Sequence, residues 1–131
     1  MSTEVERLFQ SIGNHVLDMV GDSSPKALAY AEAVDGAVSV GVFYAPRAGD
    51  VPIFKFGGKL LSDLFYSLWS EWNKESKDGP WLTASYFIQD GKPKLELVYA
   101  DRFDQKSSKN ERRSAIVEKY FGSTKVDYSQ V

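Results

Sequence analysis

Two Asp-Gly pairs, Asp35-Gly36 and Asp90-Gly91, constrain the fold of this 131-residue chain more than any other feature. A two-residue Asp-Gly loop between β-compatible runs favours a hairpin, because a type I′ turn needs positive φ at both central residues. We expect strands on both sides of each pair, at residues 26–34 and 37–44 and at residues 81–89 and 92–100. The sequence therefore predicts two hairpins, and hence an antiparallel sheet.

Apolar residues at steps of three and four predict helices around these hairpins. The first helix precedes Gly21, and its apolar positions are Val5, Leu8, Phe9, Ile12, Val16, Met19 and Val20. A second helix is expected at about residues 60–77, and a third at roughly residues 109–121. Residues 51–56 are compatible with one more short strand, with Pro52 at its start.

The predicted element order is α-β-β-(β)-α-β-β-α, in which the bracketed strand is the short one. This order gives an α+β fold: an antiparallel sheet of four to five strands with helices packed mainly on one face. Hydrophobic residues make up 43% of the chain, enough for one core. We expect a single domain, residues 1–131, with the final residues from about 123 loosely ordered.

Few residues in this chain have side chains suited to catalysis. It has no cysteine, which excludes disulfides, thiolate metal sites and cysteine nucleophiles. The one histidine, His15, has no recognisable nucleophile or orienting acid with it. Gly57-Gly58-Lys59 lacks the earlier glycine and the following Ser or Thr of a phosphate-binding loop. We therefore expect no catalytic residue, no metal site and no cofactor, and we do not expect an enzyme.

Charge is unevenly distributed along the chain, although the net charge is only −2. Residues 1–105 hold 10 Lys/Arg and 15 Asp/Glu, a balance of −5, whereas residues 106–131 hold 6 and 3, a balance of +3. A net acidic chain argues against general nucleic-acid binding. An acidic body can complement a basic partner.

The chain shows no targeting segment. Charged residues such as Glu4, Glu6 and Arg7 interrupt the apolar positions near the start, where a secretory signal needs an unbroken apolar run. Nowhere do about 18 consecutive apolar residues occur, so no membrane span is expected. These features predict a cytoplasmic protein with no membrane partner.

Four local motifs carry a resemblance to a known family. They are Tyr30-Ala-Glu32 in the first strand; Val42-Phe-Tyr44 before a Pro-containing loop; Trp81-Leu-Thr-Ala-Ser, then Asp90-Gly-Lys and a strand ending Leu97-Val-Tyr99-Ala-Asp101; and Glu111-Arg-Arg113 followed by Val117-Glu-Lys-Tyr120-Phe-Gly122. Together with the element order, these motifs resemble the YezG-type immunity proteins, also called antitoxins, which neutralise secreted bacterial nuclease toxins. The resemblance covers most of the chain.

The resemblance implies that the chain binds a cognate toxin domain and occludes its active site or nucleic-acid channel. Because nuclease clefts are basic, we expect acids on the inhibitor to face them. Strand alternation predicts that Glu32 and Glu96 share a sheet face turned away from the helices, while Asp101 and Asp104 follow one strand end. These four residues are the predicted partner-binding site.

Three other functions compete with this interpretation. A small adaptor domain unrelated to toxins is the main alternative. The others are an enzyme or small-molecule binder, and a DNA-binding regulator that uses the final helix. The final helix carries Arg112 and Arg113, which point about 100° apart on a helix. One of them can pair with an acid on the body while the other stays solvated, so we expect this helix to be a structural cover.

Overall fold

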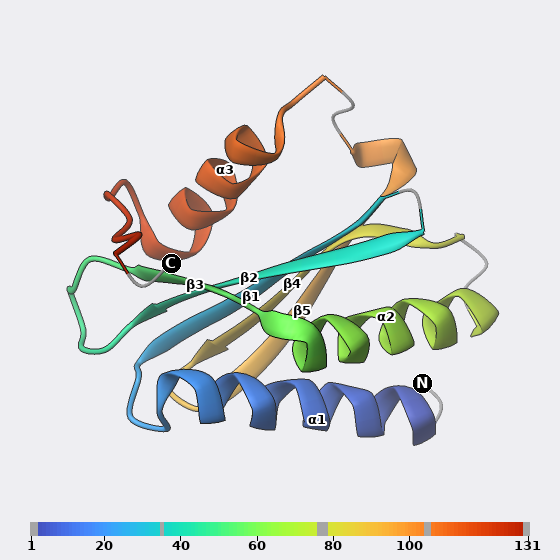
Figure 1. The fold of residues 1–131 in the computed structure, drawn as a ribbon, viewed down its shortest axis with the longest axis horizontal. Helices are drawn as coiled ribbons and strands as arrows, with labels where there is room; N and C mark the ends of the chain where they lie inside the picture. The colour runs from blue at the N-terminus through green and yellow to red at the C-terminus, as the bar shows by residue number, and fades with distance from the viewer. Residues whose placement is uncertain (1–2, 35, 76–78, 104–105, 130–131) are drawn as a thin grey trace.

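The computed structural model describes residues 3–34, 36–75, 79–103 and 106–129, and it has the predicted element order (Figure 1). Three helices and five strands make up this fold, with one turn of 3-10 helix, η1, after the last strand. Their bounds are α1 Thr3–Val20, β1 Lys26–Val34, β2 Ala37–Ala45, β3 Ile53–Phe56, α2 Gly58–Glu75, β4 Trp81–Gln89, β5 Lys92–Tyr99, η1 Ala100–Arg102 and α3 Lys109–Phe121. The predicted α+β class is confirmed.

All five strands form one antiparallel sheet in the order β3-β2-β1-β4-β5. The second predicted hairpin turn has the expected backbone, since Asp90 has φ 52° and Gly91 has φ 78°. Gly36 also has positive φ, at 78°, while Asp35 lies outside the described residues. Each hairpin therefore places its two strands side by side, and pairing between β1 and β4 joins the hairpins into one sheet.

Helices α1 and α2 lie together on one face of the sheet, and α3 lies on the opposite face (Figure 1). We call these the first and second faces. Two of the three helices share a face, as predicted, but the third does not join them. None of the described helices is long and apolar enough to cross a membrane.

The main core lies between the first face and the helix pair. Alternate residues of β1 contribute only alanine to it, from Ala27 to Ala33, and these short side chains let α1 and α2 approach the sheet closely. The larger core side chains come from the helices and from β4 and are all fully buried: Leu8, Ile12, Phe65, Leu68, Trp81 and Tyr86. Trp81, at the start of β4, thus closes one end of this core.

A smaller aromatic cluster fills the space between the second face and α3. Its buried members are Leu28, Tyr30, Phe43, Phe54, Phe87 and Val117. Helix α3 begins with a complete capping box, in which Ser108 and Glu111 bond to each other's backbone N–H, and it ends at Gly122, whose φ is 82°. Only Val117 of this helix is fully buried, so polar contacts contribute much of its attachment.

Candidate functional site

Glu32, one of the four predicted binding residues, lies on the second face beneath α3 and is 4% exposed. Arg112 of α3 donates from Nε to Glu32 Oε2 at 2.6 Å and from NH2 to Oε1 at 3.0 Å, and the Tyr30 hydroxyl donates to Oε2 at 2.8 Å. Burial alone raises the pKa of Glu32, but the hydrogen bonds from Arg112 and Tyr30 outweigh it, and the pKa lies below its ordinary value. Glu32 is therefore a fixed anion inside the fold.

Glu96 of β5 is held by the same helix. Lys119 Nζ donates to Oε2 at 2.7 Å and the Tyr120 hydroxyl to Oε1 at 2.8 Å, while Lys94 Nζ lies 3.4 Å from Oε1. The hydrogen bond from Lys119, and after it that from Tyr120, lowers the pKa of Glu96 from its ordinary 4.5 to about 2. These contacts hold the C-terminal half of α3 against the sheet. The pair between Arg112 and Glu32 does the same for its N-terminal half.

The low pKa of Glu96 predicts how acid affects stability. A carboxylate with a lowered folded-state pKa stabilises the fold above its unfolded-state pKa, and this contribution is lost as pH falls through the folded-state value. We expect the difference in free energy of unfolding between wild type and Glu96→Gln to be greatest near neutral pH and to disappear as pH falls from about 4.5 to about 2. Urea unfolding at several pH values measures this difference in free energy. Glu6→Gln is the control, because Glu6 is an exposed side chain of α1. A difference that does not change with pH would contradict the assignment.

The predicted placement of the two glutamates is correct in one respect and wrong in another. Glu32 and Glu96 do share a sheet face, as strand alternation indicated. That face is not turned away from the helices, because α3 covers it and pairs with both carboxylates. Arg112 pairs with an acid of the body, as predicted for one of the two arginines. Arg113 does not stay fully solvated, because its guanidinium lies over the ring of Phe54.

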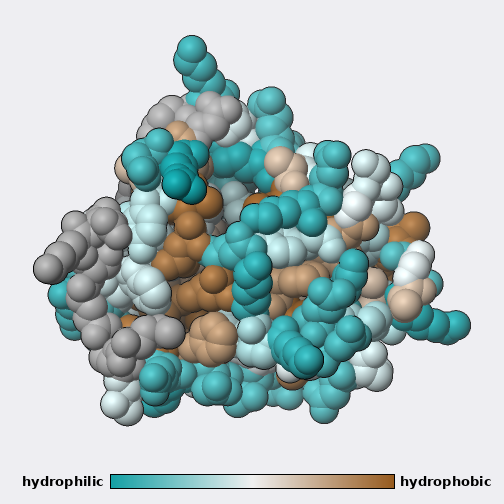
Figure 2. All heavy atoms as spheres, turned by 180° about the vertical axis from the view of Figure 1, so that it is seen from behind, coloured by the Kyte–Doolittle hydropathy of each residue, from teal (hydrophilic) through white to brown (hydrophobic). Residues whose placement is uncertain are grey.

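Asp101 remains on the surface, in η1, and Asp104 lies outside the described residues. A groove of about 580 Å³ runs beside Asp101, lined by Leu97, Tyr99, Ala100, Asp101 and Arg102. Viewed from behind, where β5 is nearest the reader, hydrophobic residues form a band bordered by hydrophilic side chains (Figure 2). Of the three described acids, only Asp101 is exposed, while Glu32 and Glu96 are paired with side chains of α3.

A different surface stands out at the other edge of the sheet, on β3. Phe54 is 2% exposed, and its ring centroid lies 5.2 Å from that of Phe56 and 5.4 Å from that of Tyr128. Phe56 and Tyr128 are themselves 60% and 53% exposed. Two further exposed apolar side chains, Val51 and Leu60, flank the strand in the sequence. We call Phe56 and Tyr128, which both lie against Phe54, the β3 surface.

Backbone pairing holds the rings of this surface in place. The Phe54 N–H donates to Asp127 O at 2.9 Å, and the Asp127 N–H donates to Pro52 O at 2.8 Å, so the C-terminal segment keeps Tyr128 beside β3. Gly41 of β2 pairs with Phe56, and a Cβ on Gly41 would come within 2.6 Å of the Phe54 ring. The close approach of Phe54 to the sheet therefore requires glycine at this position.

One cation of α3, Arg113, adjoins these rings, and a second, Lys109, lies one turn before it on the same helix. The guanidinium of Arg113 lies 5.1 Å from the Phe54 ring centroid, and its Nε is buried without a hydrogen-bond partner. Lys109 Nζ donates to Ser39 Oγ at 2.8 Å, and its pKa is lowered by burial and then by Arg113. No carboxylate within the described ranges forms a salt bridge with either side chain, although Glu32 attracts Lys109 from a greater distance. The result is a local excess of positive charge next to exposed aromatic rings.

The β3 surface was not predicted from the sequence, because its residues come from two segments that are far apart along the chain. Phe54 and Phe56 alternate in a short strand, and this pattern signals one aromatic face on β3. Tyr128 and Arg113 are more than fifty residues away, and no sequence pattern links them to that face. No three His, Cys, Asp or Glu side chains of the described residues lie together in a way that could hold a metal ion.

Neither a scan against models of protein families nor a search of curated proteins finds a match to this chain.

Proposed function

We propose that this chain works by binding another protein, and that the partner is a toxin domain which it neutralises, as the resemblance to YezG-type immunity proteins implies. The observation that carries the proposal is the β3 surface. Of the six exposed large hydrophobic side chains in the described chain, Phe56 and Tyr128 belong to it, and both rings lie against the ring of Phe54. Exposed apolar clusters on small proteins typically mark sites of interaction.

The chemistry of the β3 surface suits a protein interface. Aromatic residues and arginine are the types most enriched among residues that dominate binding energy. Covering half of an aromatic ring removes roughly 100 Å² from water, which is worth about 2 kcal/mol. Phe56 and Tyr128 both already lie against Phe54, so a partner loses little free energy in ordering them.

Neutralisation by occlusion needs only that the bound chain cover the partner's reactive cleft. Asp101, exposed in η1, can still contribute an acid to such an interface. Glu32 and Glu96 are paired with Arg112 and Lys119 within the fold, so we do not assign them to the interface. The β3 surface supplies the apolar contact that the predicted acids do not.

The experiment that tests the function is co-purification with the product of the gene immediately upstream, because an immunity gene normally follows its toxin gene. A nuclease assay on that product, with and without this chain, follows. A one-to-one complex that silences the nuclease supports the immunity proposal. A stable complex without any effect on activity supports an adaptor instead, and no complex with folded protein rejects the toxin as partner.

Truncating the two rings tests whether the β3 surface makes the contact. We expect Phe56→Ala and Tyr128→Ala each to weaken the complex at least tenfold, or about 1.4 kcal/mol, as residues at the centre of interfaces do. Tyr66→Ala is the matched control, since Tyr66 is 48% exposed but lies on α2, outside this surface. Isothermal titration gives the three affinities, and equal affinities for all three variants would place the interface elsewhere.

A further inference from the structure

We propose that the β3 surface receives an acidic side chain of the partner protein, an Asp or Glu, whose carboxylate lies against Arg113 and Lys109 while a neighbouring apolar residue packs on Phe56 and Tyr128. This inference deepens the proposed function and rests on it. It assigns an acidic contact residue to the partner. The acidic surface predicted from the sequence would instead have required a basic one.

The cations of α3 divide into two groups. Arg112 and Lys119 pair with Glu32 and Glu96 of the sheet. Lys109 and Arg113 are four residues apart, so they lie on one side of the helix. No described carboxylate forms a salt bridge with either side chain, and the nearest attraction is that of Lys109 to Glu32, which is itself paired with Arg112. Like charges at this spacing destabilise a helix, and an acid from outside would reverse that effect.

Arg113 is already arranged to receive a carboxylate. Its guanidinium lies over the buried ring of Phe54, and Nη2 lies 3.6 Å from the position that a Cβ on Gly41 would occupy. A guanidinium held against a ring loses little rotational freedom on binding, and its planar set of N–H donors matches a carboxylate in a two-point contact.

The surroundings of Arg113 provide an apolar contact for the residue next to that acid. Phe56 and Tyr128 are exposed, and both lie against Phe54. A groove of about 270 Å³ between α3 and the C-terminal segment has the apolar side chains of Val117, Val126 and Tyr128 in its lining, together with the polar side chains Ser114, Glu118, Ser123 and Thr124. The fitting partner segment is therefore an acidic residue with apolar neighbours.

Aromatic rings beside cations can also bind single-stranded nucleic acid, by stacking on bases and pairing with phosphates. The observations favour a protein, because two cations neutralise only two phosphates and the net charge of the chain is −2. The nucleic acid is therefore an outcome to be tested and not the proposal.

The first test uses peptides as probes, so it does not depend on the partner. Acetyl-Leu-Glu-Leu-amide and acetyl-Leu-Gln-Leu-amide are titrated into 15N-labelled protein. We expect the Glu peptide to shift the Arg113 Nε–H signal and the Phe56 and Tyr128 amides, and to bind roughly tenfold more tightly than the Gln peptide. Arg113→Met should abolish the difference. Equal binding of both peptides, or tighter and strongly salt-dependent binding of an oligothymidylate, would overturn the proposal.

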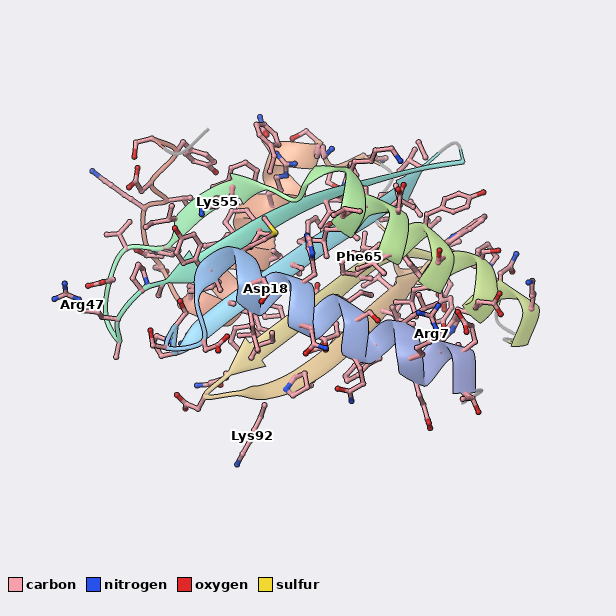
Figure 3. The ribbon with its side chains drawn as sticks, turned by 60° about the horizontal axis from the view of Figure 1, so that its bottom comes forward. Arg7, Asp18, Arg47, Lys55, Phe65 and Lys92 are labelled. Atoms are coloured by element: carbon pink, nitrogen blue, oxygen red, sulfur yellow. The ribbon has the colours of Figure 1, made fainter. Side chains whose placement is uncertain are left out.

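The second test uses the complex with the upstream product. We expect Arg113→Met and Lys109→Met to weaken it roughly 30-fold, as loss of one partner of a close charge pair does, and Arg113→Lys to weaken it less. Arg47→Met and Lys92→Met are matched controls, because both side chains point away from the body of the protein (Figure 3). Thermal unfolding confirms that each variant is folded.

The two tests separate the inference from the function on which it rests. A complex that forms but is insensitive to Arg113→Met and Lys109→Met leaves the proposed function standing and overturns the carboxylate contact. No complex with the upstream product, combined with a tenfold preference for the Glu peptide, rejects the toxin as partner and keeps the contact.

Discussion

Replacing Arg112 with methionine is expected to lower the free energy of unfolding by about 3 kcal/mol, which is a large part of the 5–15 kcal/mol typical of a domain this size. The substitution leaves the carboxylate of Glu32, 4% exposed, without its guanidinium partner. Breaking a buried ion pair on one side costs more than the pair contributes, because the remaining charge stays desolvated. Urea denaturation followed by circular dichroism measures the effect.

A double variant separates this penalty from loss of packing. Glu32→Gln keeps an acceptor for the Tyr30 hydroxyl but removes the charge, so Glu32→Gln with Arg112→Met should recover more than half of the lost stability. The penalty of the single variant should also shrink in acid, because unpaired Glu32 is then protonated. A single variant within about 1 kcal/mol of wild type would show that this pair does not hold α3.

The position of α3 illustrates what a single sequence withholds. Its bounds were predicted correctly, from the apolar spacing and from Gly122 at its end. The face of the sheet on which α3 packs was not predicted. The contacts that hold the helix there join Arg112 to Glu32 and Lys119 to Glu96, which are 80 and 23 residues apart in the sequence. Charged side chains at a helix surface are compatible with solvent as well as with a buried partner, so their pattern does not select a face.

Local turn chemistry accounts for most of the fold that could be predicted. The Asp90-Gly91 turn sets the pairing of β4 with β5, down to Gln89 opposite Lys92. It does not determine that β1 pairs with β4, which places β1 at the centre of the sheet. The alanine-rich composition of β1 fits that central position, since both of its faces are covered.

The candidate site was harder to predict than the fold. Strand alternation located Glu32 and Glu96 on one face, but their burial depends on a helix that follows in the sequence. The β3 surface joins Phe56 with Tyr128, and a bridge between Ile53 and Asp127 brings the two segments together. Such pairing at a strand edge has no local signal, because backbone groups rather than side chains make it.

Phe54 connects the stability of the fold to the β3 surface. Its ring centroid lies 5.0 Å from that of Phe43. The same ring also contacts Phe56, Tyr128 and the guanidinium of Arg113. We expect Phe54→Ala to lower the free energy of unfolding by about 3–5 kcal/mol, as truncation of a buried aromatic ring does. It should also weaken the complex with the partner, because the exposed rings and Arg113 lose the surface that orients them.

Phe65→Ala is the control that separates these two effects. Phe65 is fully buried on α2, in the core of the first face (Figure 3), so its truncation should cost about the same free energy of unfolding. It leaves Phe54 and the β3 surface intact, and we expect the affinity of the folded protein for its partner to stay within about twofold of wild type. Affinity is measured at a temperature where both variants are folded. A similar loss of affinity in both variants would mean that binding follows global stability and that Phe54 has no separate role in arranging the interface.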